Sequence, residues 1–307
     1  MKTLLNALIM FQAMVLSTIA VSQNIIAEKH YEDSNVKSVK IIGSFCDVQV
    51  VPGSRLVFDG IIKGDGDEGD YIIAMVKSGD DLLFKVERKR DRNWGWNDID
   101  LARLDLELPT GVELVIDNSS GDIKVTGYEG SFLDVSSTSG DMALKEIKAE
   151  VGARSTSGDV VMRNVVGDVS MRSTSGDQNY FEIKGNLRTV ATSGDIEVVR
   201  LTGDLNVETT SGDTELDDVV GAISARSTSG NIEGEYITIS GDCRFKSTSG
   251  NIYMELRNDL EDVGFDLRAT SGDLEAGRID GEDRLVIRRG KYEISGVSTS
   301  GDQTYTN

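Results

Sequence analysis

The chain is poor in the residues on which most catalytic and metal sites depend. It has one histidine, two cysteines, two prolines and two tryptophans in 307 residues, and 6% of its residues are aromatic. His30 lies outside the repeats described below, so nucleophilic Ser–His and Cys–His sites have no base within them. No Cys/His cluster has zinc-ligand spacing, and we expect no metal and no cofactor. Cys46 and Cys243 lie far apart in apolar segments, which favours buried free thiols over a disulfide.

Basic residues are also scarce, with 32 Lys and Arg against 52 Asp and Glu and a net charge of −20. This excess argues against nucleic acid or an anionic membrane as the main partner. The first 22 residues combine Lys2, an apolar run from Leu4 to Val21 and the small-residue segment Ala20-Val21-Ser22. They predict a secretory signal peptide over 1–22 and export to the periplasm, cell surface or medium; an uncleaved anchor is the alternative. No later stretch is long and apolar enough to span a membrane.

What the chain has in abundance is a repeat. The phrase Thr-Ser-Gly-Asp returns at a fixed interval, and six of its glycines are each 18 residues apart. A second set of glycines falls nine residues after some of the first. A fixed period of this length is the signature of a repeat architecture. The series is Gly121, then Gly140, Gly158, Gly176, Gly194, Gly212 and Gly230, continued by Gly250, Gly272 and Gly301 at wider spacing.

Each repeat predicts one coil of a solenoid. In 193–213, Ile196 and Val198 alternate with polar residues, as do Leu205 and Val207, which indicates two short half-buried strands with tight turns between them. Eighteen residues are too few for a strand–helix–strand crossover, which needs about 30. The sequence therefore predicts an all-β, single-chain parallel β-solenoid with coils about 4.8 Å apart. Mid-sized aliphatic side chains fill an interior about 10 Å thick, and we expect large aromatic side chains to be excluded from it. The handedness stays open.

The turns carry glycine because it adopts positive φ without strain, and aspartate because it bonds its own backbone there. Nonapeptide calcium rolls also have two nine-residue halves per coil, so calcium binding is an alternative function of this column. Asn231 and Asn251 replace Asp at two positions, which a turn tolerates better than a calcium site does. We assign structural turns to Gly158, Asp159, Gly176, Asp177, Gly194, Asp195, Gly212 and Asp213.

The domain organisation follows from where the repeat begins. We expect a signal peptide over 1–22, an N-terminal β-rich cap over 23–110 and the solenoid over 111–307. The stretches 71–76 and 82–86 flank Lys77-Ser78-Gly79-Asp80 and predict a hairpin. This cap would cover the open edge of the first coil, and any edge left open predicts edge-to-edge self-association.

Two candidate contact surfaces stand out in this acidic chain. A basic segment from Arg88 runs into both tryptophans, which predicts a contact loop; a hairpin end folded onto the cap is the alternative. A column of basic residues precedes the Ser-Thr pairs. We interpret it as a solvated face, and it becomes the next candidate contact surface if the loop is not one. The loop residues are Arg88, Arg90, Arg92, Trp94 and Trp96; the column is Arg154, Arg172, Arg226, Lys246 and Arg268, interrupted by Val190 and Glu208.

The motifs resemble a known family. The run 104–125, with Leu-Pro-x-Gly-Val-x-Leu and then Ser-Ser-Gly-Asp-Ile-x-Val, is followed by recurrent Thr-Ser-Gly-Asp, and 45–53 reads Phe-Cys-Asp-Val-x-Val-x-Pro-Gly. Together they are similar to the "putative adhesin" β-solenoid domains of bacterial exported proteins, over nearly the whole chain after 1–22. The resemblance implies an exported, non-enzymatic β-solenoid and supplies no catalytic or ligand residues.

Three hypotheses for function follow. The first is a non-enzymatic exported scaffold or adhesion module whose partner is a cell-surface glycan or protein. The second is a polysaccharide-active β-helix lyase or hydrolase, in which paired carboxylates would act on a sugar chain. The third is a calcium-dependent assembly module.

Overall fold

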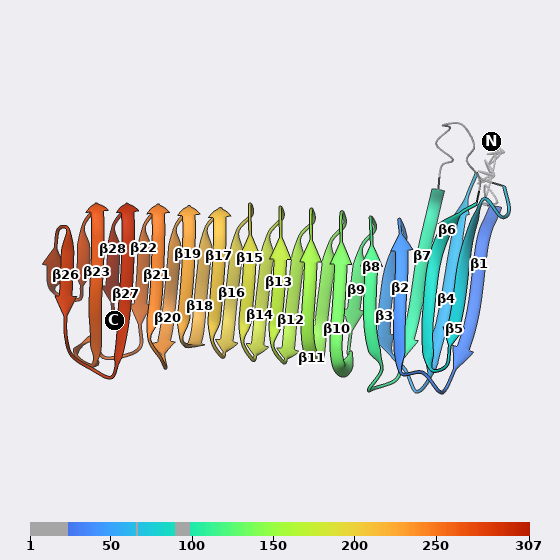
Figure 1. Ribbon diagram of the computed structural model, residues 1–307, viewed down its shortest axis with the longest axis horizontal. Helices are drawn as coiled ribbons and strands as arrows, with labels where there is room; N and C mark the ends of the chain where they lie inside the picture. The colour runs from blue at the N-terminus through green and yellow to red at the C-terminus, as the bar shows by residue number, and fades with distance from the viewer. Residues whose placement is uncertain (1–23, 66, 90–98) are drawn as a thin grey trace, which may run out of the picture.

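The computed structural model describes residues 24–65, 67–89 and 99–307 and is nearly all β. The predicted β-solenoid is confirmed: strands stack in a long two-layered rod (Figure 1), and the only helix among the described residues is the short 3₁₀ turn η1 (Leu260–Asp262). No helix in the described part of the chain is long and apolar enough to cross a membrane. The predicted signal peptide, 1–22, lies outside the described residues.

Two ladders of strands form the two faces of the rod. Strand β11 contributes to both, and this joins all 28 strands into one hydrogen-bonded system. In spatial order the front ladder is β5 (Tyr71–Ser78), β6 (Asp81–Arg88), β2 (Ser38–Ser44), β8 (Glu113–Asn118), β10 (Glu129–Ser137), β11 (Met142–Ser155), β13 (Val169–Ser173), β15 (Leu187–Ala191), β17 (Leu205–Ser211), β19 (Ile223–Ser229), β21 (Cys243–Ser249), β27 (Tyr292–Ser300), β23 (Val263–Ser271) and β26 (Arg284–Ile287).

The back ladder closes each coil on the other side. Its strands are β1 (Asn24–Asp33), β4 (Leu56–Gly64), β7 (Ile99–Leu108), β3 (Asp47–Pro52), β9 (Ile123–Thr126), β11, β12 (Val160–Val166), β14 (Gln178–Lys184), β16 (Ile196–Thr202), β18 (Thr214–Gly221), β20 (Ile232–Ile239), β22 (Ile252–Leu256), β28 (Gln303–Thr306), β24 (Leu274–Ala276) and β25 (Ile279–Gly281).

The Ser-Gly-Asp corners hold the coils in register, but through a contact that the sequence did not predict. Each aspartate does not bond its own backbone; its Oδ1 accepts the backbone N–H of the equivalent residue in the next coil. Asp195 N–H donates to Asp177 Oδ1 at 2.9 Å, for example. Asn231 fits because its amide oxygen accepts in the same way, from Asn251. This corner ladder has N–O distances of 2.7–3.0 Å and runs through Asp47, Asp122, Asp141, Asp159, Asp177, Asp195, Asp213, Asn231, Asn251, Asp302 and Asp273.

A second bend, in the back-ladder strands β11, β12, β14, β16, β18 and β20, lies on residues other than glycine. The pairing skips one residue per coil, between Lys145 and Ile147 for example, and the skipped residue has φ near +57°. Such a conformation costs about 1 kcal/mol or more for a residue with a side chain. The sequence pattern gave no sign of this bulge because no glycine marks it. The column is Glu146, Asn164, Glu182, Arg200, Asp218 and Tyr236.

The interior is mostly aliphatic, but the prediction that it excludes large aromatic side chains is wrong. Tyr180 and Tyr305 are fully buried, and each ring faces a small or polar neighbour. A side chain on Gly296 would meet the Tyr305 hydroxyl at 2.8 Å, so the glycine opens space for the ring. The Tyr180 hydroxyl donates to Gln178 Oε1 at 2.7 Å and lies 3.0 Å from the Thr189 hydroxyl. Gln178, a polar exception to the inward pattern, is therefore a partner of Tyr180.

The N-terminal region extends the same two ladders. Strands β2 and β3 form a coil that pairs in parallel with β8 and β9, and β6 and β7 stack on that coil in turn. The predicted hairpin is confirmed as the antiparallel pair β5–β6. At the outer end, β1 pairs antiparallel with β4. These added strands cover the β8–β9 coil, whose edge would otherwise be open.

At the C-terminal end the coils are not stacked in chain order. The last coil, β27–β28, inserts between the β21–β22 coil and the β23–β24 coil (Figure 1). The corner ladder follows this order, because Asp302 N–H donates to Asn251 and Asp273 N–H donates to Asp302. Strands β25 and β26 then pair antiparallel on the outer side of β24 and β23. The sequence series Gly250, Gly272, Gly301 predicted the corners but not their spatial order.

Candidate functional site

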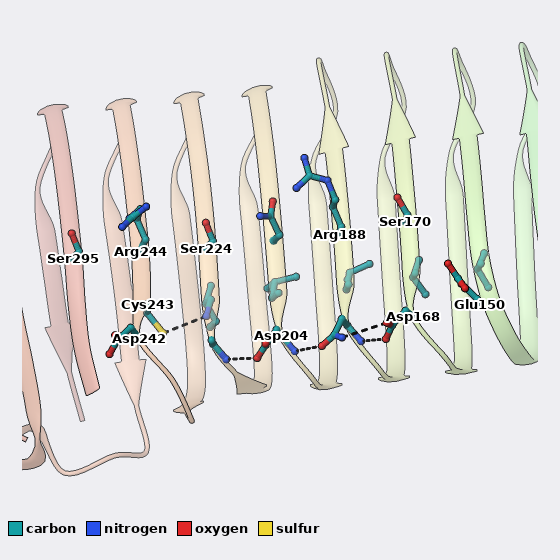
Figure 2. A pocket seen from close by; sticks show the side chains of 18 of the residues that line it. Glu150, Asp168, Ser170, Arg188, Asp204, Ser224, Asp242, Cys243, Arg244 and Ser295 are labelled. Carbon is teal, nitrogen blue, oxygen red and sulfur yellow. Dashed lines mark hydrogen bonds between the residues drawn. The ribbon is translucent and has the colours of Figure 1, made fainter. Parts of the chain in front are cut away.

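A shallow groove runs along the front ladder, across the strands. Its volume is ≈ 650 Å³, and its lining comes from seven strands or the corners that precede them, β11, β13, β15, β17, β19, β21 and β27. One margin of the groove is a column of corner residues that includes Asp168, Asp204 and Asp242 (Figure 2). The floor is a second column, of strand residues that point outward. That floor column is Ser170, Arg188, Asn206, Ser224, Arg244 and Ser295.

The parallel register places the floor column in line. Ser170 pairs with Arg188, Arg188 with Asn206, and Asn206 with Ser224 in successive ladders. In a strand, alternate side chains point to opposite faces, so these residues point outward while Val169 and Leu187 beside them are buried. The result is a row of hydroxyl, amide and guanidinium groups spaced about 4.8 Å apart.

The margin carboxylates are already engaged by the backbone. Asp168 Oδ1 accepts the N–H of Asn186 at 2.8 Å, Asn186 Oδ1 accepts that of Asp204 at 3.0 Å, and Asp204 Oδ1 accepts that of Ala222 at 3.0 Å (Figure 2). Asp242 Oδ1 accepts from Glu293 N–H at 3.0 Å. These residues therefore form a second corner ladder, broken at Ala222, whose first task is to hold the coils together.

The cations beside the groove are only partly neutralised. Arg154 pairs with Asp134 at 3.3 Å and Arg188 with Glu208 at 3.2 Å, both exposed contacts of small value. Arg226 and Lys246 lie directly opposite each other in the β19–β21 ladder, and Arg244 lies on the same face. Within the described residues, Arg226, Arg244 and Lys246 form no ion pair and no side-chain hydrogen bond.

The structure places the residues predicted from sequence in separate regions. Arg88 ends β6 at the N-terminal end of the rod, with its guanidinium carbon 6.0 Å from the Tyr71 ring centroid. Arg90, Arg92, Trp94 and Trp96 lie outside the described residues, so the contact loop stays a prediction. Arg154, Arg172, Arg226 and Lys246 lie on the front ladder next to the groove. The corner residues from Gly158 to Asp213 lie on the narrow edge, away from it.

The floor column was missed from sequence. Its members have no shared residue type, and Ser295 belongs to the last coil in the chain. Aligning the repeats on the second glycine set, Gly167, Gly185 and Gly203, would have brought Ser170, Arg188 and Asn206 into one column. That signal contained serine and asparagine, which are common on any exposed strand, and so it did not stand out.

The thiols do not form a reactive site. Cys46 and Cys243 are both free and buried, as predicted. Burial raises the pKa of Cys46 to about 12 and that of Cys243 to about 11. Both thiols stay protonated near neutral pH and are poor nucleophiles. Cys243 Sγ instead accepts the N–H of Ile223 at 3.3 Å, within the wall of the groove.

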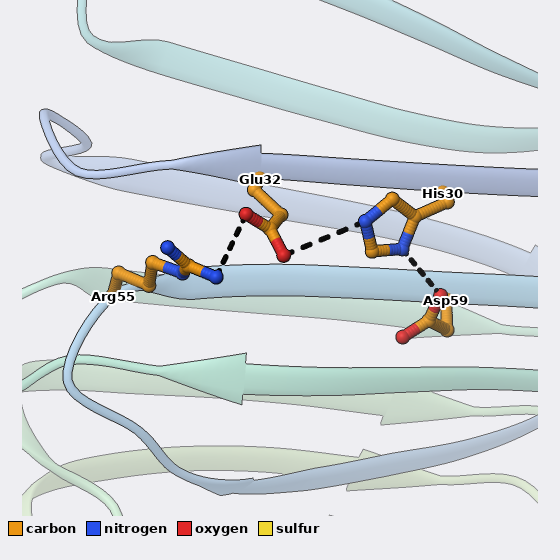
Figure 3. Close-up of polar contacts among 4 residues, drawn as sticks. All are labelled: His30, Glu32, Arg55 and Asp59. Carbon is orange, nitrogen blue, oxygen red and sulfur yellow. Dashed lines mark hydrogen bonds and ion pairs between the residues drawn. The ribbon is translucent and has the colours of Figure 1, made fainter.

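The single histidine lies in an exposed ion-pair cluster (Figure 3) on β1, a strand at the N-terminal end of the rod (Figure 1). On β1, the ring of His30 contacts Asp59 of β4 through Nδ1 at 2.6 Å and Glu32 through Nε2 at 3.5 Å; Arg55 pairs with Glu32 at 2.8 Å. The hydrogen bond to Asp59 raises the pKa of His30 above its ordinary value of 6.5. The cluster is exposed to solvent and joins the outer strand β1 to β4.

This contact predicts a pH response that one resonance can report. Because the pKa of His30 is raised in the folded protein, protonated His30 stabilises the pairing of β1 with β4. This contribution to stability is complete at pH values below the pKa of the unfolded chain, and it is lost as the pH rises through the folded pKa. In an NMR titration of the only imidazole, Asp59→Asn should move the pKa of His30 down towards its ordinary value. Glu32→Gln, the control, should move it less. A wild-type pKa at the ordinary value would contradict the Asp59 contact.

Together these observations define the class of protein: a single-chain parallel β-solenoid with a polar, cation-flanked groove along one face. The chain belongs to the Toastrack DUF4097 family, whose model matches residues 97–206 and 199–306. Comparison with curated proteins gives no match.

Three solved structures show a weak likeness to this chain, at low identity. A "putative lipid binding protein" from Parabacteroides distasonis has 14% identity and a TM-score of 0.39, with 92% of this chain and 97% of that chain covered. A "putative adhesin" from Parabacteroides merdae has 10% identity and a TM-score of 0.26, covering 90% and 95%. A "putative cell adhesion protein" from Clostridium sporogenes has 10% identity and a TM-score of 0.22, covering 91% and 98%. Likeness this low bears on neither binding nor activity.

Proposed function

We propose that this protein is a non-enzymatic, exported β-solenoid that binds an extended polymer, a cell-surface glycan, along the front-ladder groove. The observation that carries the proposal is the row of outward hydroxyl, amide and guanidinium groups, which continues across six adjacent strands. A compact ligand would contact only part of such a row. A chain that lies across the strands meets a similar set of groups at every coil.

The floor chemistry suits a hydroxyl-rich ligand. Serine hydroxyls and the Asn206 amide both donate and accept hydrogen bonds, as sugar hydroxyls do. Shallow polar grooves of this kind exchange bound water for ligand at modest affinity per contact, so affinity accumulates along the polymer. The repeated architecture supplies the required number of contacts without long loops.

The hypothesis of a sugar-cleaving enzyme meets a difficulty at the groove margin. A glycosidase needs one carboxylic acid free to donate a proton and a second carboxylate free to act as base or nucleophile. Oδ1 of each of Asp168, Asp204 and Asp242 accepts a backbone N–H of the next coil. The other two acids of the lining, Glu150 on β11 and Glu293 on β27, lie at opposite ends of the groove and cannot act as a pair. We therefore propose binding without cleavage. Product analysis after incubation with a panel of acidic and neutral glycans distinguishes the two, since reproducible cleavage contradicts the proposal.

The calcium hypothesis meets a similar difficulty. Aspartates of the corner ladder use one carboxylate oxygen each for the next coil, and within the described residues no group of three or more His, Cys, Asp or Glu side chains is placed to hold a metal ion. A chelator should therefore leave melting and sedimentation unchanged. Export, and with it a location in the periplasm, at the surface or outside, remains a proposal that depends on residues 1–22.

A bulky side chain in the groove tests the proposal. Ser224→Trp places a large ring on the floor in mid-groove, on an exposed strand position where tryptophan is compatible with β-structure. We expect binding to an immobilised glycan panel to fall about tenfold or more, because the ring blocks a continuous ligand. The control is Val166→Trp, which places the same ring at an exposed position of the back ladder.

Thermal melts of both variants should match wild type, which separates loss of binding from loss of fold. Equal binding by Ser224→Trp and Val166→Trp would place the contact surface elsewhere. The predicted loop of Arg88, Arg90, Arg92, Trp94 and Trp96 would then be the next candidate.

A further inference from the structure

The polar groove described above lies beside an arrangement of cations that a hydroxyl-rich ligand alone does not explain. Arg226 and Lys246 face outward in direct register on neighbouring strands, and Arg244 is two residues from Lys246 on the same face. Like charges in register repel each other. Glu208 lies in register with Arg226 on the neighbouring strand, but its carboxylate pairs with Arg188 instead.

A second pair of cations lies further along the same face. Arg154 and Arg172 are in register across the β11–β13 ladder, and Arg172 forms no ion pair among the described residues. Between the two groups lies Arg188, whose exposed pair with Glu208 is weak enough to be exchanged for another anion. Cations thus occur on β11, β13, β15, β19 and β21, a span of five strand spacings, or about 24 Å.

We propose that the ligand of this groove is an acidic polysaccharide, whose carboxylate or sulfate groups are held by Arg172, Arg188, Arg226, Arg244 and Lys246 while its hydroxyls bond to the serine and asparagine floor. This inference rests on the proposed function and adds the charge of the ligand to it. Charge-assisted hydrogen bonds to guanidinium groups are shorter and stronger than neutral ones, and arginine matches planar anions.

The lining also argues for charge over stacking as the source of affinity. None of the described residues that line the groove is aromatic, so a neutral sugar has no ring face on which to stack. Hydrogen bonds to neutral groups gain little against water. The carboxylates of the lining, including Glu150 and Glu293, belong to the corner margin and repel an anion, so an acidic ligand would be held by the cations of the floor and of the neighbouring column. A ligand without anions would leave Arg244 and Lys246 without an ion pair.

Nucleic acid is the competing polyanion, and two observations disfavour it. The net charge of −20 repels a densely charged phosphate backbone over the whole molecule. The groove lacks the aromatic platforms on which single-stranded bases stack. An acidic polysaccharide carries sparser charge and more hydroxyls, which agrees better with cation groups separated by Ser170, Asn206 and Ser224.

The test compares two triple variants of the full-length chain. Arg226→Gln, Arg244→Gln, Lys246→Gln removes the cations beside the groove. Lys145→Gln, Lys148→Gln, Lys184→Gln removes three exposed lysines from the back ladder, so the two proteins have equal net charge. Binding is measured to polygalacturonate, hyaluronan and chondroitin sulfate, to neutral dextran, and to single- and double-stranded DNA. Thermal melts confirm that both variants fold.

We expect wild type and the back-ladder variant to bind at least one acidic polysaccharide alike, with affinity that falls as salt rises. The groove variant should bind it about tenfold more weakly, and dextran should bind poorly to all three proteins. The proposed charge of the ligand would be wrong if wild type and the groove triple variant both bind dextran and Ser224→Trp does not. The proposed function would then still hold. Preference for DNA would overturn this inference in favour of nucleic acid. No binding to any polymer, or binding equal in both triples and in Ser224→Trp, would overturn the proposed function as well.

Discussion

Gly194→Val is expected to break the solenoid at its centre. Gly194 has a φ of +104°, and a Cβ placed on it would lie 2.3 Å from the carbonyl oxygen of Gly176 in the preceding coil and 2.7 Å from its carbonyl carbon. Both neighbours are backbone, so neither can rotate away. The corner must open, which also separates the Asp177 and Asp195 contact at 2.9 Å. We expect a loss of about 3–5 kcal/mol in the free energy of unfolding, at the upper end for single substitutions.

A matched glycine separates the clash from backbone strain. Gly79, in the β5–β6 hairpin turn, has a φ of +64°, and a Cβ there would meet nothing within 4 Å. Gly79→Val should therefore cost only the strain of a left-handed β-branched residue, about 1–2 kcal/mol. Guanidinium unfolding of both variants measures the difference. If the two variants lose the same free energy of unfolding, close packing of the corner backbones is not the reason why position 194 requires glycine.

Hydrogen exchange adds a spatial check. Stability in a stacked repeat is close to a sum of coil terms and neighbour terms, so damage at one corner should be local. In Gly194→Val the amides of β14 to β17 should exchange fastest among the central strands, while β8 to β11 keep most of their protection. Uniform loss of protection would instead mean that the whole rod unfolds as one unit.

The period of the sequence explains why the fold could be predicted so fully. A glycine every 18 residues with alternating apolar residues between fixes coil length, strand number and inward positions, and all three agree with the structure. The prediction of the interior side chains was wrong where two of them must fit each other. Tyr305 fits only because Gly296 is small, and Tyr180 because Gln178 and Thr189 satisfy its hydroxyl. The pairs Tyr305–Gly296 and Tyr180–Thr189 join positions on opposite sides of a coil, which a one-dimensional pattern does not show.

The candidate site could be predicted only in part, for a related reason. The column containing Arg154 and Arg172 was visible because each member precedes a Ser-Thr dipeptide that recurs along the chain. Its neighbours Arg188 and Arg244 each stand six residues before a corner glycine, but serine and asparagine hold the same position in the other coils of the groove floor, so no charge pattern marked this column. The groove itself is a property of the sheet surface. Side-chain geometry decides which cations form ion pairs. The pairing of Arg188 with Glu208, for example, could not be predicted from the spacing of the two residues.

Removal of residues 291–307 is expected to release far more of the chain than the deleted coil. Strand β23 pairs with β26 and β27, and β24 pairs with β25 and β28; neither pairs with β21 or β22. The β27–β28 coil is thus the connection between β23–β26 and the rest of the rod. Without it we expect 257–290 to lose protection in hydrogen exchange and to be cleaved by protease, while β8 to β20 remain protected.

A stack in chain order predicts the opposite, because there the last coil would be terminal and its loss would uncover only one neighbour. The full-length variant Ile294→Asp offers an independent check, since it buries a charge in the same coil at a side chain with 0% exposure. It should expose 257–290 in the same way without shortening the chain. If β23 and β24 stay protected in the truncated protein, they have docked directly on β21 and β22. The inserted order would then be a preference among alternative stacks, because the corner backbone is nearly the same in every coil and the Asn251–Asp302–Asp273 contacts could re-form as Asn251–Asp273.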